Sequence, residues 1–227
     1  MDLQRYEEIL QGELKERFDA FKNMLLFYNN KFNLTAITDE KDIYIKHFLD
    51  CVAGDMFFDK CVSVVEIGSG GGFPSVPLKL FRDDLSFTLV ESTGKKCEYL
   101  KAVVDNLKLS CVQVKNARAE ELGRDRKYRE KFDVCTARAV ARLNTLAEYC
   151  LPFVKVGGRF IAYKGNCAEE LEEAKKAFDI LGGEIEHVEK YELPNGEART
   201  LVVVRKVKHT PEKYPRGQGK ERKCPLR

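Results

Sequence analysis

The chain has 227 residues, a formal net charge of +3, and a composition of 44% hydrophobic and 33% charged residues. This length suits one domain with an appendage, and this balance is typical of soluble globular proteins. Collagen-like, coiled-coil and disulfide-framework proteins are excluded, and no apolar run approaches the roughly 18 residues that a membrane span needs. The first residues, MDLQRYEEIL, do not match a secretory signal, so we expect a cytoplasmic protein.

The eight cysteines are spread along the chain, and the two closest, Cys51 and Cys61, lie ten positions apart. No C-x2-C spacing of a zinc site occurs, so we expect reduced thiols and no bound metal. Cys111 and Cys135 stand within apolar runs, where we expect them to serve as small hydrophobic residues.

The charge is distributed unevenly along the chain. Residues 205–227 hold nine Lys or Arg against two Glu, a net +7, which leaves −4 for residues 1–204. The same segment contains three of the seven prolines. We therefore expect residues 208–227 to form a basic tail that is an extended arm rather than a helix.

Two helices are predicted for an N-terminal unit, residues 1–56. Apolar residues recur three or four positions apart over residues 2–28, which predicts a long amphipathic helix that the tract 29–33 breaks. A second helix is expected to begin at the capping residues Thr38 and Asp39 and to end at Gly54.

From residue 62 onward, strand-like runs alternate with helical ones, which is typical of a parallel α/β sheet. Seven strands are predicted, at residues 63–67, 86–90, 111–114, 132–136, 159–163, 184–191 and 200–207. The last two are separated only by the turn at 193–196, so we expect this pair to be antiparallel. We assign residues 57–207 to this α/β domain.

A glycine-rich turn follows the first predicted strand, in the sequence VVEIGSGGGFP of residues 64–74. Glycine lets the backbone approach a nucleotide or amino-acid group closely at the start of the following helix. The alternative is a plain structural turn. A dinucleotide fingerprint read from Gly68 would require glycine at position 73, where Phe73 stands, so a pyrophosphate site is less favoured.

Further signals lie at the ends of the next four strands. Glu91 ends the second strand, where a carboxylate can bind ribose hydroxyls, and Ala119 and Glu120 follow the third, where they could contact an adenine edge. Arg138 and Lys164 follow the fourth and fifth strands. Taken singly, Glu91, Glu120 and Lys164 could be ordinary solvated side chains. Because open parallel sheets bind ligands at this edge, together they predict one site.

These motifs resemble those of the RsmG family, also called GidB or glucose-inhibited division protein B, which are 16S rRNA guanine-N7 methyltransferases that use S-adenosylmethionine. The similar segments are NKFNLT at 30–35, KHFLD at 46–50, EIGSGGGFP at 66–74, LVES-x-x-KK at 89–96, ARAEEL at 117–122, ARAVA at 137–141, YKG at 163–165 and YPRGQGK at 214–220. Two features depart from the family pattern. Ser75 stands where the family usually has glycine, and residues 123–131 look charged and extended.

The resemblance implies a class I S-adenosylmethionine-dependent methyltransferase with a Rossmann-like, seven-stranded, mostly parallel sheet. It implies cofactor binding by a set of residues at the strand ends, namely Gly68, Gly70, Phe73, Glu91, Ala119, Glu120 and Arg138, with Glu91 on the ribose. The implied substrate is a guanine in the decoding-region loop of 16S rRNA, either free or in the small ribosomal subunit. We expect a monomer without membrane contact.

RNA contacts are expected from five residues in the last third of the chain, namely Lys164, Arg199, Tyr214, Arg216 and Lys220. In the basic tail, Tyr214 could stack on an unpaired base and Arg216 could bind a phosphate. We expect the tail to add affinity for RNA and none for the cofactor. A tail that only solubilises the protein is the alternative.

Methylation at guanine N7 uses a lone pair that is already free, so no general base is assigned. Catalysis is expected to rest on positioning, with Arg138 and Lys164 as candidates for orienting the cofactor, a phosphate or the guanine. His47 is interpreted as structural. Two alternatives are a nicotinamide-dependent oxidoreductase, against which Phe73 and the antiparallel strand pair argue, and an RNA-binding module with a vestigial pocket, against which the joint presence of the cofactor residues argues.

Overall fold

The centre of the protein is a single sheet of seven strands, seen in a computed structural model that describes residues 11–227. The strands are β1 (Ser63–Ile67), β2 (Ser86–Glu91), β3 (Val112–Asn116), β4 (Phe132–Arg138), β5 (Val154–Lys164), β6 (Gly183–Glu192) and β7 (Ala198–Lys206). Their order is β3-β2-β1-β4-β5-β7-β6, and the first five are mutually parallel. β7 is antiparallel to both β5 and β6, so the predicted strand count and the antiparallel last pair are confirmed.

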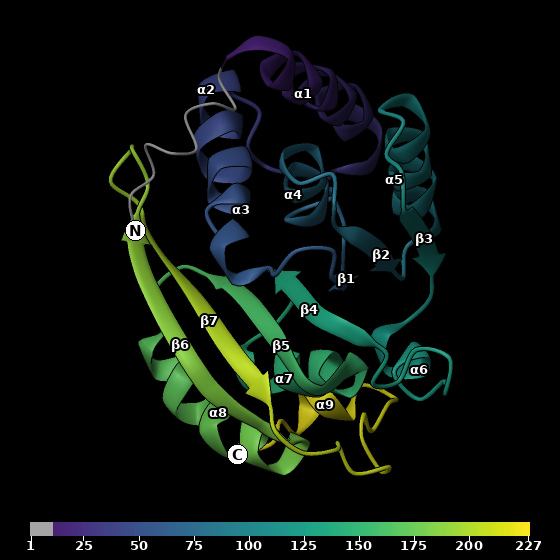
Figure 1. Cartoon of the computed structure of the whole chain (residues 1–227), viewed down its shortest axis with the longest axis vertical. Coiled ribbons are helices and arrows are strands. Elements are labelled where there is room, and N and C mark those ends of the chain that lie inside the picture. The colour runs from purple at the N-terminus through teal and green to yellow at the C-terminus, as the bar shows by residue number, and fades with distance from the viewer. Residues whose placement is uncertain (1–10) are drawn as a thin grey trace.

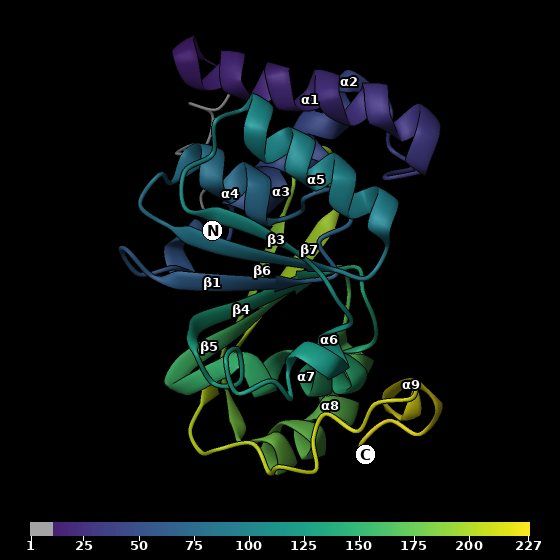
Figure 2. The same ribbon diagram turned by 90° about the vertical axis from the view of Figure 1, so that its right-hand side faces the viewer.

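Helices cover both faces of the sheet (Figures 1 and 2). One face carries α1 (Gly12–Phe32), α4 (Ser75–Phe81) and α5 (Gly94–Asn106). The other carries α6 (Ala119–Leu122), α7 (Leu143–Cys150), α8 (Ala168–Leu181) and the short α9 (Lys220–Lys223). Each face buries its own hydrophobic cluster, and successive residues such as Val64 and Val65 belong to different clusters. Central strands such as β1 and β2 are buried on both faces, which is why they are continuous apolar runs in the sequence, whereas the edge strands β3 and β6 are partly exposed and carry polar residues.

The N-terminal helices begin and end close to the predicted positions. Of the helix predicted over 2–28, residues 2–10 lie outside the described residues, and the part described runs on to Phe32. It ends at Asn33, which adopts a left-handed conformation that asparagine tolerates. The second helix begins as predicted, because the Asp39 carboxylate accepts a hydrogen bond of 3.0 Å from the Asp42 N–H. Helical residues then continue through α2 (Glu40–Asp42), a π-helical segment (Ile43–Leu49) and α3 (Asp50–Val52).

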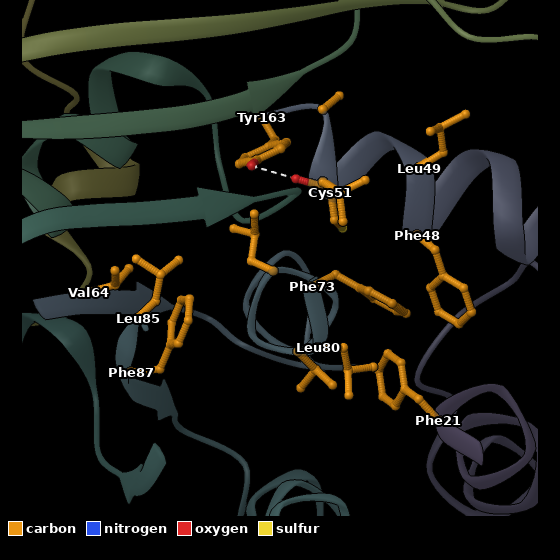
Figure 3. Packing of buried hydrophobic residues seen from close by; sticks show 14 of the residues in the cluster. Phe21, Phe48, Leu49, Cys51, Val64, Phe73, Leu80, Leu85, Phe87 and Tyr163 are labelled. Atoms are coloured by element: carbon orange, nitrogen blue, oxygen red, sulfur yellow. Dashed lines mark hydrogen bonds between the residues drawn. The ribbon is translucent and has the colours of Figure 1, made fainter. Parts of the chain in front are cut away.

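Aromatic side chains join these helices to the glycine turn (Figure 3). Phe21 of α1 is fully buried, and its ring lies 5.5 Å from Phe48 and 5.7 Å from Phe73 between ring centroids. On the sheet side, the Tyr163 hydroxyl donates a 2.8 Å hydrogen bond to the Cys51 carbonyl. The N-terminal helices therefore share one core with the sheet. They line one side of the space beyond the carboxyl ends of β1 and β4.

The prediction that the basic tail is an extended arm is wrong. Residues 211–224, which we call the C-terminal strap, fold back over α7 and end in α9. The residues at 123–131, expected to be extended, form turns whose arginines bind the strap. Arg129 donates a hydrogen bond of 2.8 Å to the Tyr214 carbonyl, and Arg124 donates one of 2.8 Å to the Pro215 carbonyl. The tail is thus held against the body of the protein by arginines that precede it in the chain.

All eight cysteines are free, and five of them are buried. Cys135 serves as a small core residue, as expected, whereas Cys111 is exposed in the turn before β3. Within residues 11–227 no helix combines the length and the apolar character needed to cross a membrane.

Candidate active site

Three cavities adjoin one another at the carboxyl ends of the parallel strands. The Glu120 pocket has a volume of about 350 Å³, and its walls include Ala119, Glu120, Tyr149, Gly219 and Arg222. The glycine pocket has a volume of about 440 Å³, and its walls include Gly68, Gly70, Phe73, Glu91, Arg138 and Arg222. The Lys164 pocket has a volume of about 320 Å³, and its walls include His47, Asp50, Arg138, Lys164, Glu170 and Arg199. Because neighbouring cavities share wall residues, they form one row along this edge of the sheet.

The glycine turn opens into the middle cavity. Gly68 has φ +71° and Gly70 has φ +49°, a region that side chains with a β-carbon rarely adopt. A β-carbon at Gly68 would lie 2.7 Å from a methyl of Val140, so glycine is needed there for packing. At Gly70 the nearest described atom would be the Gly68 carbonyl oxygen at 3.6 Å. A side chain at position 70 would therefore extend into the cavity, which only glycine leaves clear.

Glu91 is a structural part of this turn and not a solvated strand-end residue. Its side chain is only 6% exposed. One carboxylate oxygen accepts a hydrogen bond of 3.0 Å from the Gly70 N–H, and the other accepts one of 2.7 Å from the Thr93 N–H. Since each oxygen has a further lone pair, the carboxylate can still accept hydrogen bonds from a ligand in the glycine pocket.

A stack of two rings closes the side of the glycine pocket next to the N-terminal helices. The His47 ring lies over Phe73 with 4.3 Å between ring centroids, and Phe73 is 7% exposed. Burial, together with the charge of Arg138, lowers the pKa of His47 to about 3, so this ring is neutral at physiological pH. The neutral ring accepts a hydrogen bond from Arg138 at Nδ1, and its Nε2 lies 2.8 Å from the Thr35 hydroxyl. The interpretation of His47 as structural agrees with these contacts.

Arg138 points its donors toward the N-terminal helices. Its guanidinium donates to the Asp50 carboxylate at 2.8 Å and to the Lys46 carbonyl at 3.1 Å, and it lies 5.0 Å from the centroid of the Phe73 ring. Arg138 lines both the glycine pocket and the Lys164 pocket. Its contacts hold Phe73 and His47 in place, and a direct contact between Arg138 and a cofactor stays a prediction.

The residues expected to bind RNA fall into two groups. Lys164 and Arg199 line the Lys164 pocket, and Lys220 is exposed on α9. Tyr214 is only 7% exposed and belongs to the second hydrophobic cluster. Arg216 forms a 2.7 Å ion pair with the fully buried Glu148. The predictions that Tyr214 stacks on a base and that Arg216 binds a phosphate are therefore wrong. Both side chains anchor the strap instead, Tyr214 by its burial and Arg216 by its ion pair.

Lys164 is held in place by two partners. Its ammonium group forms an ion pair of 2.7 Å with Glu170 and donates to the Ala141 carbonyl at 3.1 Å. The side chain is therefore an ordered wall of its pocket and not a freely solvated strand-end lysine.

Among residues 11–227 no group of three His, Cys, Asp or Glu side chains is arranged to hold a metal ion.

Glu66, which no sequence motif marks as a site residue, is fully buried at the end of β1, next to the glycine turn. Burial raises the pKa of this carboxyl to about 8, against the smaller opposite effect of Ser75 and Ser69. Ser75, the departure from the family pattern, is thus a buried neighbour of Glu66. An acidic residue inside the apolar run VVEI was the signal that could have revealed it.

We expect Glu66 to make the protein less stable as the pH rises. The Glu66 carboxyl group stays protonated up to about pH 8 in the folded protein, whereas in the unfolded chain it loses its proton near the ordinary pKa of 4.5. The contribution of Glu66 to stability is therefore fully present below about pH 4.5 and is lost as the pH rises to about 8. Thermal unfolding at a series of pH values should give a steeper fall of Tm for the natural protein than for Glu66→Gln. Parallel curves for the two proteins would contradict this assignment.

Comparison with known proteins gives one consistent result. The family model described as rRNA small subunit methyltransferase G, or GidB, matches residues 14–202. The ribosomal RNA small subunit methyltransferase G of Acetivibrio thermocellus is 46% identical over 219 residues, which are 96% of this chain and 90% of that protein. The protein of the same name from Lactobacillus acidophilus is 43% identical over 233 residues, covering 100% and 97% of the two chains.

Solved structures resemble this chain at the level of the fold. An S-adenosylmethionine-dependent methyltransferase from Aquifex aeolicus superposes with a TM-score of 0.57 at 16% identity, over 77% of this chain and 97% of that one. An S-adenosylmethionine-dependent O-methyltransferase from Thermotoga maritima gives 0.53 at 14% identity, over 82% and 73%. The class I methyltransferase fold is thereby confirmed.

Proposed function

This chain belongs to the rRNA small subunit methyltransferase G family and is an S-adenosylmethionine-dependent rRNA methyltransferase; we propose that its methyl acceptor is N7 of a guanine in the decoding-region loop of 16S rRNA. The observation that supports this proposal is the row of three adjoining cavities at the strand ends. Two of them can hold the cofactor, and the third can hold the acceptor base beside it.

We place the adenosine part of the cofactor in the Glu120 pocket, the ribose against Glu91 and the methionine part in the glycine pocket. The chemistry of these residues fits that order. The buried Glu91 carboxylate has lone pairs for ribose hydroxyls, and the bare backbone at Gly70 leaves the cavity clear for an amino-acid group. Ala119, at the first position of α6, offers a backbone N–H toward the adenine end.

The acceptor guanine would enter the Lys164 pocket, on the other side of Arg138 from the Glu120 pocket. When bound, the cofactor supplies an electrophilic methyl group. The protein's part is to hold the base near that group, since N7 already carries a free lone pair. The Lys164 ammonium, fixed by Glu170 and the Ala141 carbonyl, can orient the guanine edge or a neighbouring phosphate. His47, which is neutral, adds no positive charge to a site where positive charge moves onto the purine.

If N7 is the acceptor, the rate of single-turnover methylation should be independent of pH from neutral to mildly alkaline conditions. An exocyclic amine or a ribose hydroxyl would instead need a proton removed, which gives a rate that rises with pH. The measurement uses saturating cofactor and rRNA. Glu66→Gln serves as a control, because the pKa of Glu66 is raised to about 8 and could add a slope of its own. A rise with pH that persists in Glu66→Gln would contradict the N7 assignment.

The deciding experiment for the proposed function is analysis of modified nucleotides. The purified protein is incubated with S-adenosylmethionine and either protein-free 16S rRNA or small ribosomal subunits, and nuclease digests are examined by mass spectrometry. The rRNA is taken from cells that lack the gene. We expect it to contain 7-methylguanosine at one position after the reaction and unmodified guanosine at that position before it. The same comparison identifies the form of rRNA that is methylated.

We further propose that the enzyme acts as a cytoplasmic monomer.

A further inference from the structure

The C-terminal strap contributes walls to both proposed cofactor cavities. Gly219 and Arg222 line the Glu120 pocket together with Ala119 and Tyr149. Arg222 also lines the glycine pocket. The strap comes from the end of the chain, and Figure 2 shows it beside α7, on the face of the sheet that carries α6.

The strap is fixed to α7 by buried polar contacts. Arg216 pairs with the buried Glu148 at 2.7 Å, and its backbone N–H donates to the same carboxylate at 2.8 Å. Thr145 of α7 donates from its hydroxyl to the Glu221 carbonyl at 3.0 Å. The buried Glu221 carboxylate in turn accepts a hydrogen bond from the Gly217 N–H. These contacts hold the short helix α9, and with it the backbone of Arg222, at the mouth of the cavities.

The chemistry of Arg222 suits a flat aromatic ligand. The Arg222 side chain is exposed, and it lines the Glu120 pocket together with the ring of Tyr149, which is 6% exposed. A guanidinium group is planar and stacks on aromatic rings as well as attracting them electrostatically. The Glu120 pocket, which Tyr149, Arg222 and the first residues of α6 line, has a volume of about 350 Å³, which gives room for an adenine ring.

We propose that the C-terminal strap is the outer wall of the cofactor pocket and that Arg222 stacks on the adenine of S-adenosylmethionine. This inference rests on the proposed placement of adenosine in the Glu120 pocket. It reverses the expectation that the tail serves RNA alone. Arg222 is thus a cofactor-binding residue, supplied by a segment whose charge suggested only RNA binding.

The test is isothermal titration of two ligands, S-adenosylmethionine and 5′-methylthioadenosine, which has the adenosine part but lacks the amino-acid part. Arg222→Ala should weaken both by about fivefold, the range expected for loss of a partly exposed cation–π contact. Lys223→Ala is the matched control, since Lys223 is an exposed neighbour in α9 that is not a wall residue of either cavity. It should bind both ligands like the natural protein.

Unchanged affinity of Arg222→Ala, an equal loss in Lys223→Ala, or a loss confined to S-adenosylmethionine would each overturn the adenine contact. Arg222→Lys keeps the charge but not the plane, so it should also bind more weakly, and full affinity in this variant would overturn stacking. Thermal unfolding confirms that the variants are folded. If the natural protein itself binds neither ligand, the proposed cofactor site fails; if it binds both and Arg222→Ala equals it, only this inference fails.

Discussion

Replacing Gly70 by valine should abolish binding of S-adenosylmethionine and leave a folded protein. The β-carbon would point into the glycine pocket, where the nearest described atom is the Gly68 carbonyl oxygen at 3.6 Å, so the branched methyls would occupy ligand space. Valine also disfavours φ +49°, at a cost of about 1–2 kcal/mol. A shift of this backbone would break the bond between the Gly70 N–H and Glu91. Isothermal titration measures the affinity, and circular dichroism verifies the fold.

Gly157→Val is the matched control for this experiment. Gly157 also has a positive φ, +92°, and no described atom would lie within 4 Å of an added β-carbon. Valine at Gly157 therefore imposes the same kind of backbone strain far from the three cavities. We expect Gly157→Val to bind the cofactor normally with a modest loss of stability. Normal binding by Gly70→Val would remove the turn from the site, and loss of binding in both variants would assign the effect to strain.

Glu91→Gln should weaken binding of S-adenosylmethionine by about tenfold to a hundredfold. The carboxylate accepts hydrogen bonds from Gly70 and Thr93, and an amide can accept with only one of its two terminal atoms. The bond lost within the protein lowers the stability of the turn, whereas the loss of a charged acceptor for the ribose, worth about 1.5–3 kcal/mol, accounts for the expected loss of affinity. Titration with S-adenosylmethionine measures the total loss.

The contribution of the ribose can be separated from that of the turn. A 2′-deoxy analogue of the cofactor should bind more weakly than S-adenosylmethionine to the natural protein, and the difference should shrink in Glu91→Gln. Glu98→Gln is the control, since Glu98 is an exposed carboxylate on α5 close in sequence. If Glu91→Gln and Glu98→Gln both bind the cofactor as the natural protein does, Glu91 is not a ligand.

The sequence by itself determined the sheet and the rim of the site. The predicted runs of the central strands, such as β1 and β2, lie close to the observed strands because these strands are buried on both faces, which is a local property of the chain. The glycine turn, Glu91 and the Ala119–Glu120 pair follow their strands directly, so the direction of a parallel sheet was enough to bring them to one edge. The short turn between the last two strands likewise determined that they pair antiparallel.

Only the tertiary structure decided what the charged side chains do. Arg138 turns to Asp50, 88 positions away, and Arg216 to Glu148, 68 positions away, and neither partner is marked by any local pattern. The net charge of the tail could not distinguish cations that face solvent from cations that hold the strap on α7. A buried carboxylate such as Glu148 binds the nearest guanidinium because leaving either charge unpaired out of water is costly. That pairing places Arg222 at the cofactor cavities, a position that follows from how the chain end packs and not from its composition.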